Sequence, residues 1–256
     1  MLGAIVGDVV GSIYEQKVIR TKDFPLFQPK SHFTDDTVLT LAIADAIIHQ
    51  GDYRQFLRQY FRQYPYAGYG SRFILWAVSG IPQPYYSFGN GSAMRVSPVA
   101  YKCQDLDTVL QESQRAAAVT HNHPEGIKGA QAIAAAIFMA RQQCSKSEIK
   151  SFITSNFHYD LSPALDAVPP AGVSCQTSVP QALIAFLSSD NFEDAIRNAI
   201  FIGGDSDTLA CMTGAIAEPF YGGVPSWIAQ ETMVRLDDNL RSVSTTFLAE
   251  YGLKPC

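Results

Sequence analysis

The chain has 256 residues, of which 47% are hydrophobic, and a formal net charge of −5 at pH 7. This length fits one large domain or two small ones with a sizeable core. This negative net charge does not indicate the positively charged surface that binds a nucleic acid or an anionic membrane, so we expect neither as a partner.

The cysteines and the N-terminal segment favour a cytoplasmic protein. The five cysteines are scattered, odd in number and without a CxxC pair, at Cys103, Cys144, Cys175, Cys211 and Cys256. This usage indicates reduced thiols rather than a disulfide framework or a thiolate metal site. Residues 1–6 are apolar, but no basic region precedes them and Asp8 soon follows, so we predict no signal peptide. No stretch reaches the roughly 18 apolar residues of a membrane span. We expect a monomer with one domain over residues 1–256.

The first predicted helix covers residues 2–15. Three glycines lie four residues apart in it, at Gly3, Gly7 and Gly11. Glycine in a helix costs about 0.5–1 kcal/mol relative to alanine, so a stripe of three predicts close packing against another helix. Asp8 and Glu15 share one face with Gly11 and could line a site. An exposed helix end is the simpler interpretation of Glu15 alone.

A loop over residues 16–33 leads to Thr34-Asp35-Asp36-Thr37, which opens a second predicted helix ending near His49. The next helix, over residues 53–64, repeats aromatic residues and leucine at helical spacing, which is typical of core packing. Residues 65–92 are rich in Gly, Pro, Tyr and Ser and are predicted to form an ordered loop. Glycines and small hydroxyl residues before a helix can hold a phosphate on backbone N–H groups. The run Gly89–Ser92 fits that use, but it fits a plain turn equally.

The remaining predicted elements are helices. One starts near residue 93 and another ends near Thr120; the others cover residues 125–141, 145–157, 178–187, 191–201 and 226–249. His121 and His123 lie between two of them without a third ligand nearby, so zinc is not expected. One of the two is a candidate ligand contact. Because no β-branched alternation occurs, we predict an all-α fold packed through Gly and Ala.

A second acidic helix start follows Gly203 and Gly204. Asp205, Asp207 and Thr208 lie within four positions and precede an apolar run to Ile216. Helix capping is the ordinary use of such residues. The two acidic starts together offer only carboxylates and hydroxyls, which suit magnesium or manganese. If they face each other, the converging carboxylates require bound cations for stability.

Five sequence blocks make the chain resemble the ADP-ribosylglycohydrolases. The blocks are GAIVGDVVGSIYE (3–15), FTDDT (33–37), GNGSAMR (89–95), THNHPEGIKGA (120–130) and GGDSDTLACMTGAIAEPFYG (203–222). They span almost the whole chain, and the paired TDDT and GDSDT blocks are the specific ones.

The resemblance implies an all-helical fold with a two-magnesium centre, for which Mn²⁺ is an alternative. The metal ligands it implies are Thr34, Asp35, Asp36, Asp205, Asp207, Thr208 and, at or near the metals, Glu15. The implied ligand contacts are Tyr86, Ser87, Phe88, Gly89, Asn90, Gly91, Ser92 and His121, along the diphosphate and its ribose, together with Asp35. Asp36 or Asp207 would bridge the metals, and Glu15, Asp35 or Asp36 would act in catalysis.

The implied reaction is hydrolysis of the O- or N-glycosidic bond between ADP-ribose and an acceptor, a protein side chain or a small compound. Two alternatives stay open from the residues. One is a non-catalytic ADP-ribose-binding homologue. The other is a two-metal nucleotide phosphohydrolase, since oxygen ligands beside a phosphate loop fit that chemistry too.

Overall fold

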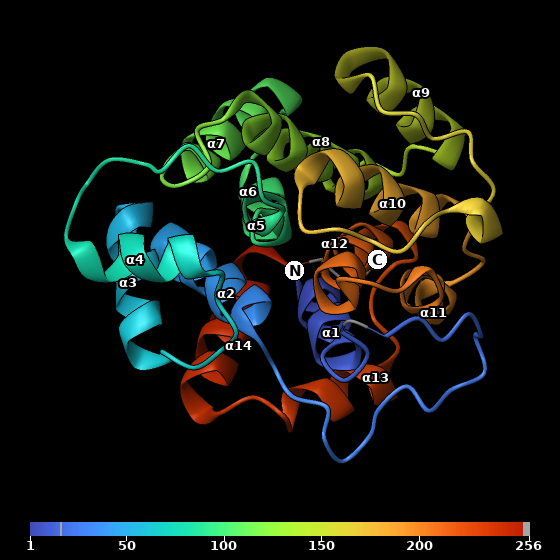
Figure 1. Cartoon of the computed structure of the whole chain (residues 1–256), viewed down its shortest axis with the longest axis horizontal. Helices are drawn as coiled ribbons and strands as arrows, with labels where there is room; N and C mark the ends of the chain where they lie inside the picture. The colour runs from blue at the N-terminus through green and yellow to red at the C-terminus, as the bar shows by residue number, and fades with distance from the viewer. Residues whose placement is uncertain (16, 253–256) are drawn as a thin grey trace.

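The computed structural model describes residues 1–15 and 17–252 and is all-helical, as predicted. Among these residues the only β pairing consists of two isolated bridges, Gly89 with Ser174 and Ala171 with Gly204. The helices are α1 (Leu2–Gly11), α2 (Asp35–Ile48), α3 (Tyr53–Gln63), α4 (Ser71–Ser79), α5 (Gly91–Met94), α6 (Ser97–Lys102), α7 (Leu106–Ala118), α8 (Pro124–Arg141), α9 (Lys146–Phe157), the 3-10 helix η1 (Leu165–Ala167), α10 (Cys175–Leu187), α11 (Phe192–Ile202), α12 (Ser206–Phe220), α13 (Ser226–Met233) and α14 (Asp238–Tyr251). Figure 1 shows their arrangement around α1 and α12.

Helices α1 and α12 pack closely at the centre of the molecule (Figure 1). A Cβ atom on Gly3 would lie 2.1 Å from the carbonyl oxygen of Gly214, and one on Gly7 would lie 2.0 Å from that of Ala210. Such distances are shorter than real Cβ contacts, so only glycine permits this approach. The glycine stripe of the first helix therefore has the predicted close-packing role.

Helix α2 is buried along most of its length. It packs against α1, α3, α6 and α14, so apolar side chains are favoured on all its faces. Thr34 caps the helix, and its hydroxyl oxygen accepts a hydrogen bond from the backbone N–H of Asp36 across 3.3 Å. The same packing that buries the helix carries its acidic first turn into the interior.

The structure corrects three element predictions. Residues 65–92 are not one loop, because they contain α4, which buries Phe73 and Trp76. The first helix ends at Gly11 rather than near residue 15, and a turn follows, closed by the hydrogen bond from the N–H of Tyr14 to the carbonyl of Gly11. The helix predicted over residues 226–249 is two helices, since Asp237 caps a new start by accepting from the N–H of Leu240.

Two further observations concern the chain as a whole. None of the described helices combines the length and apolar character that a membrane crossing requires. The described cysteines Cys103, Cys144, Cys175 and Cys211 are free thiols, and Cys256 lies outside the described residues.

Candidate metal and ligand site

A cavity of about 520 Å³ lies at the beginnings of α2 and α12. Its volume falls within the range of roughly 300–1,000 Å³ that is usual for small-molecule sites. Most residues predicted for the site line it: Glu15, Thr34, Asp35, Asp36, Ser87, Gly89, Asn90, Gly91, His121, Asp205, Asp207 and Thr208. Segments far apart in the sequence therefore meet around one space.

Asp8 joins α1 to the start of α2 beneath this cavity. Its carboxylate accepts hydrogen bonds from the hydroxyl of Thr34 at 2.7 Å, from the N–H of Thr34 at 2.9 Å and from the N–H of Thr37 at 3.0 Å. The Asp8 carboxylate thus satisfies free N–H groups at the N-terminus of α2. Asp8 is fully buried, so it fixes the orientation of the acidic turn from below.

Three buried carboxylates converge on one point. Oxygen atoms of Asp8, Asp36 and Asp207 lie within 4.8 Å of one another. The glycine stripe permits this, because a Cβ on Gly11 would lie 2.4 Å from the Cα of Asp207. Thr208 donates its hydroxyl hydrogen to Asp36 across 3.2 Å. The buried Oδ1 of Asp36 has no hydrogen-bond partner within the described part of the chain.

The pKa values of these carboxyl groups are raised. Burial raises the pKa of Asp36, and the charges of Asp207 and Asp8 raise it further. The pKa of Asp207 is raised by burial and by the charge of Asp205. Burial and the charge of Asp8 raise the pKa of Asp35 to about 8. A group of like charges out of water is costly, and bound cations would remove that cost.

The opposite wall of the cavity is the loop that leads into α5. Asn90 donates from its side-chain amide to Asp205 across 2.7 Å, which ties the loop to the start of α12. The N–H of Asn90 is bonded to the carbonyl of Val173, and the N–H of Gly89 to the hydroxyl of Ser87. These contacts hold Gly89 and Gly91 against the ring of His121.

Three predicted ligand contacts lie outside the cavity lining. Ser92 is buried, and its hydroxyl donates to the carbonyl of Gly126 at 2.7 Å, which joins the loop to α8. Tyr86 and Phe88 are exposed, and their rings lie 4.7 and 5.4 Å from that of His123, between centroids. In this structure the side chains of these three residues therefore do not face the cavity lining.

The structure extends the predicted set of site residues. Asp8, which the sequence analysis placed on one face with Glu15 but not among the metal ligands, belongs to the acidic cluster itself. Arg95 and Tyr85 line the cavity on the side of His121. Arg95 is fully buried, and charged side chains are rarely fully buried unless a polar or charged group pairs with them.

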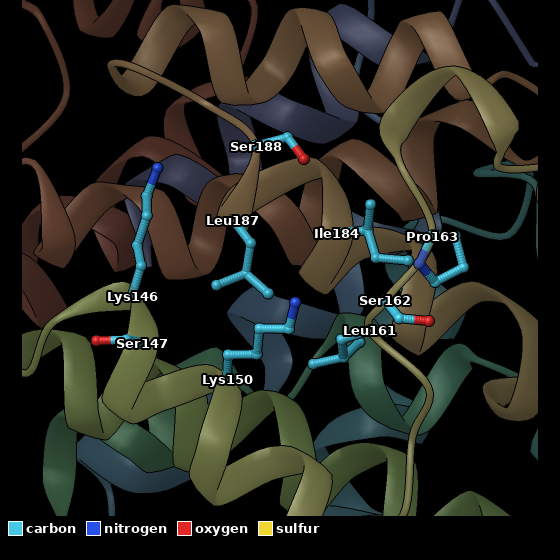
Figure 2. Close-up of a pocket in the computed structure, with 9 residues that line it drawn as sticks. All are labelled: Lys146, Ser147, Lys150, Leu161, Ser162, Pro163, Ile184, Leu187 and Ser188. Carbon is cyan, nitrogen blue, oxygen red and sulfur yellow. The ribbon is translucent and has the colours of Figure 1, made fainter.

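A second hollow, of about 240 Å³, lies between α9, the 161–163 segment and the end of α10 (Figure 2). Its charged side chains are Lys146 and Lys150. The ammonium group of Lys146 already donates to the carbonyl of Ser189 and lies over the ring of Phe186. Because its lining holds no carboxylate, this hollow offers none of the oxygen ligands gathered in the larger cavity.

Comparison with known proteins gives a family match over nearly the whole chain. The ADP-ribosylglycohydrolase family model matches residues 1–251. The ADP-ribosylarginine hydrolase Tri1 of Pseudomonas putida (strain GB-1) is 29% identical, over 89% of this chain and 72% of that protein. The ADP-ribosylhydrolase ARH3 of Danio rerio is 25% identical, over 94% of this chain and 88% of that protein.

Among solved structures, a chain of an "ADP-ribosylglycohydrolase-related protein complex" superposes with a TM-score of 0.75. The match covers 97% of this chain and 96% of the other, at 22% sequence identity. At that identity the likeness supports the fold, which agrees with the helical arrangement described above.

Proposed function

Because the chain belongs to the ADP-ribosylglycohydrolase family, we propose that it hydrolyses the O- or N-glycosidic bond between ADP-ribose and an acceptor and releases ADP-ribose. The acceptor is a protein side chain or a small ADP-ribosylated compound. Family membership and the hydrolase relatives support ADP-ribosyl hydrolase activity. The observation that carries the proposal in this chain is the meeting of two acidic helix starts over Asp8 in one cavity.

We propose that this acidic cluster holds two Mg²⁺ ions, with Mn²⁺ as the alternative. The donor set fits hard cations, because it consists of carboxylate and hydroxyl oxygens. The unpartnered buried oxygen of Asp36 and the raised pKa values of Asp36 and Asp207 support the same assignment. The ligands would be Thr34, Asp35, Asp36, Asp205, Asp207 and Thr208, with Glu15 at or near them. Bound there, such cations would supply Lewis acidity to the ribose hydroxyls and to water.

The remaining roles follow from where the side chains lie. Asp8 and Asn90 orient ligands, because Asp8 fixes the first turn of α2 and Asn90 fixes Asp205. Glu15 lies in the cavity wall and is the exposed residue among the predicted metal ligands, so water can reach it. We assign it the removal of a proton from the attacking water. Asp35 is assigned contacts to the ribose.

The other half of the cavity suits the diphosphate and adenosine. Ser87, Gly89, Asn90, Gly91 and His121 provide small or polar groups along one wall. The cavity lining also includes apolar and aromatic side chains, among them Phe73, Tyr85, Met94 and Val173. Such a surface fits a purine ring, which binds largely through stacking and apolar contact.

The test is release of free ADP-ribose from ADP-ribosylated arginine, serine and threonine peptides in the presence of Mg²⁺. Asp205→Ala and Asp35→Ala should abolish release while the circular dichroism spectrum stays helical. Appearance of AMP or phosphate instead of intact ADP-ribose would contradict the proposal and favour a phosphohydrolase. Release that persists after chelation of the metal would contradict the metal assignment.

A further inference from the structure

His121 is held by two hydrogen bonds in series that begin at a buried arginine. Arg95 Nη2 lies 2.8 Å from the hydroxyl oxygen of Thr120, and that oxygen lies 2.7 Å from Nδ1 of His121. The three residues are 1%, 0% and 4% exposed, respectively. Their side chains are therefore shielded from bulk water, and Nε and Nη1 of Arg95 have no hydrogen-bond partner among the described residues.

The donors and acceptors of this series fix the position of one proton. A guanidinium group only donates, so the hydroxyl oxygen of Thr120 accepts from Arg95. The hydroxyl hydrogen of Thr120 then needs an acceptor, because a buried unpaired hydroxyl is costly. The hydroxyl of Tyr85 also hydrogen-bonds Thr120, but a phenol has its own hydrogen to donate to the Thr120 oxygen. This leaves Nδ1 of His121, at 2.7 Å, to accept the hydrogen of Thr120. The ring proton of neutral His121 consequently sits on Nε2.

Nε2 of His121 faces the loop that contains Gly89 and leads into α5. A Cβ atom on Gly91 would lie 3.3 Å from Nε2, and one on Gly89 would lie 3.5 Å from it. His121 lines the cavity, and no hydrogen bond within the described residues uses Nε2. The two glycines leave this edge of the ring open toward a ligand that lies along the loop.

The surroundings also keep the ring neutral. Burial lowers the pKa of His121 well below its ordinary value, and the positive charges of Arg95 and Arg72 lower it further. Burial lowers the pKa of Arg95 only to about 10, so the guanidinium stays charged near neutral pH. No ion pair of the described chain joins Arg95 to a carboxylate, so no direct contact with an acidic side chain neutralises its guanidinium group.

We propose that Arg95 and Thr120 are positioning residues that hold His121 as its Nε2–H tautomer, so that His121 recognises a phosphate or ribose oxygen of ADP-ribose as a neutral hydrogen-bond donor. The identity of the ligand rests on the proposed function, whereas the tautomer does not. A donor fixed before binding loses little entropy when the ligand arrives, which is the advantage of this arrangement. Tyr85, whose ring lies 5.9 Å from that of His121, limits rotation of the imidazole.

The tautomer can be read from long-range ¹H–¹⁵N correlation spectra of the histidine rings in the ligand-free protein. His121→Asn identifies the signals of His121 by their loss. We expect the Nε2–H pattern in the wild type, its loss or mixing in Thr120→Val, and its return in Thr120→Ser, which restores a hydroxyl. Thr232→Val is the matched control, because it removes a buried hydroxyl that has no hydrogen-bond partner among residues 1–15 and 17–252 and lies outside the cavity lining. It should leave the spectrum of His121 unchanged.

Calorimetry with ADP-ribose is the second measurement. Thr120→Val should weaken ADP-ribose binding by about fivefold to tenfold, as expected for one misdirected hydrogen bond, and Thr120→Ser should restore it. An Nδ1–H pattern in the wild type, or an unchanged pattern in a folded Thr120→Val, would overturn the inference. Wild-type protein that releases no ADP-ribose would contradict the proposed function instead, and the ligand-free spectra would still decide the tautomer.

Discussion

Thr208, in the first turn of α12, donates its hydroxyl hydrogen to Asp36, in the first turn of α2, across 3.2 Å. The two residues are 172 positions apart in the sequence, yet they share one buried acidic cluster. Each acidic turn alone is an ordinary helix start. Their contact shows that the two turns form one site, and ionised carboxylates this close together out of water repel one another unless counter-charge is present.

Asp36→Asn should stabilise the metal-free protein and remove its response to Mg²⁺. Burial and the charges of Asp207 and Asp8 raise the pKa of Asp36. At pH 8, folding must therefore either protonate this carboxyl group or bury its charge, and both oppose folding. The neutral amide removes that cost, and we expect a gain of about 1–2 kcal/mol in the free energy of unfolding at this pH. ADP-ribose release should fall to background. Urea unfolding with and without Mg²⁺ measures both the change in stability and the response to Mg²⁺.

Asp45→Asn is the control on the same helix. Asp45 accepts from the hydroxyl of Tyr60 at 2.9 Å and lies outside the cluster. Its amide variant should be slightly less stable and should keep the full response to Mg²⁺. A metal-free Asp36→Asn protein that is less stable than the wild type at pH 8 would show that the cluster carries no repulsion.

Stability of the metal-free protein should decrease as the pH rises. Burial and the charge of Asp8 raise the pKa of Asp35 to about 8, whereas an unfolded aspartate titrates near pH 4. Between these values the folded state binds more protons than the unfolded state, so the free energy of unfolding falls by at most about 1.4 kcal/mol per pH unit for this group. Differential scanning fluorimetry from pH 5 to pH 8 should show a decreasing Tm, by about 2–4 °C for each kcal/mol.

Added Mg²⁺ should reverse this trend, because cations bind the ionised carboxylates. The increase in Tm caused by Mg²⁺ should be larger at pH 8 than at pH 5, where the carboxyl groups keep their protons. An equal increase at both pH values, or none at either, would contradict a cation site in this cluster. Addition of a chelator at pH 8 should return the Tm to its metal-free value.

Asn90→Ala tests whether the loop positions a metal ligand. Without the amide that donates to Asp205 across 2.7 Å, this carboxylate loses its orienting partner. Such indirect partners typically change metal affinity or activity by about 10–100-fold. We expect the Mg²⁺ concentration for half-maximal ADP-ribose release to rise within that range. Asn156→Ala, on exposed α9, should leave it unchanged.

Two sequence patterns were enough to predict much of the fold. Apolar spacing predicted most helices, and the absence of β-branched alternation predicted the lack of a sheet. Helix α4 was missed because the glycines and prolines that flank it dominated the composition, while its own buried residues, Phe73 and Trp76, were few. The break before α14 was missed because Asp237 reads equally as a cap or as an exposed helix residue.

Some residues of the site could be identified from the sequence, and others could not. The acidic turns at Asp35 and Asp205 could be paired because the same combination, two aspartates and a threonine at a helix start, occurs twice in the chain. Asp8 could not be assigned to the cluster, since a single carboxylate in an apolar helix does not reveal what it faces. The role of Arg95 depends on Thr120, 25 residues further along the chain, and only the folded structure brings them together.

Gly7→Ala should strongly destabilise the protein, because the position of the acidic cluster depends on how closely α1 and α12 approach. An alanine Cβ at this position would lie 2.0 Å from the carbonyl oxygen of Ala210 and 2.5 Å from the N of Cys211, which are backbone atoms that cannot move aside. Separating the helices would cost packing on both sides, so we expect a loss of about 3 kcal/mol or more in the free energy of unfolding.

Gly70→Ala is the control, since its Cβ would meet no atom within 4 Å and its φ of −61° suits alanine. Urea unfolding should show Gly70→Ala within about 0.5 kcal/mol of the wild type. If both variants unfold like the wild type, α1 and α12 do not need the glycine stripe, and its spacing would have no structural role.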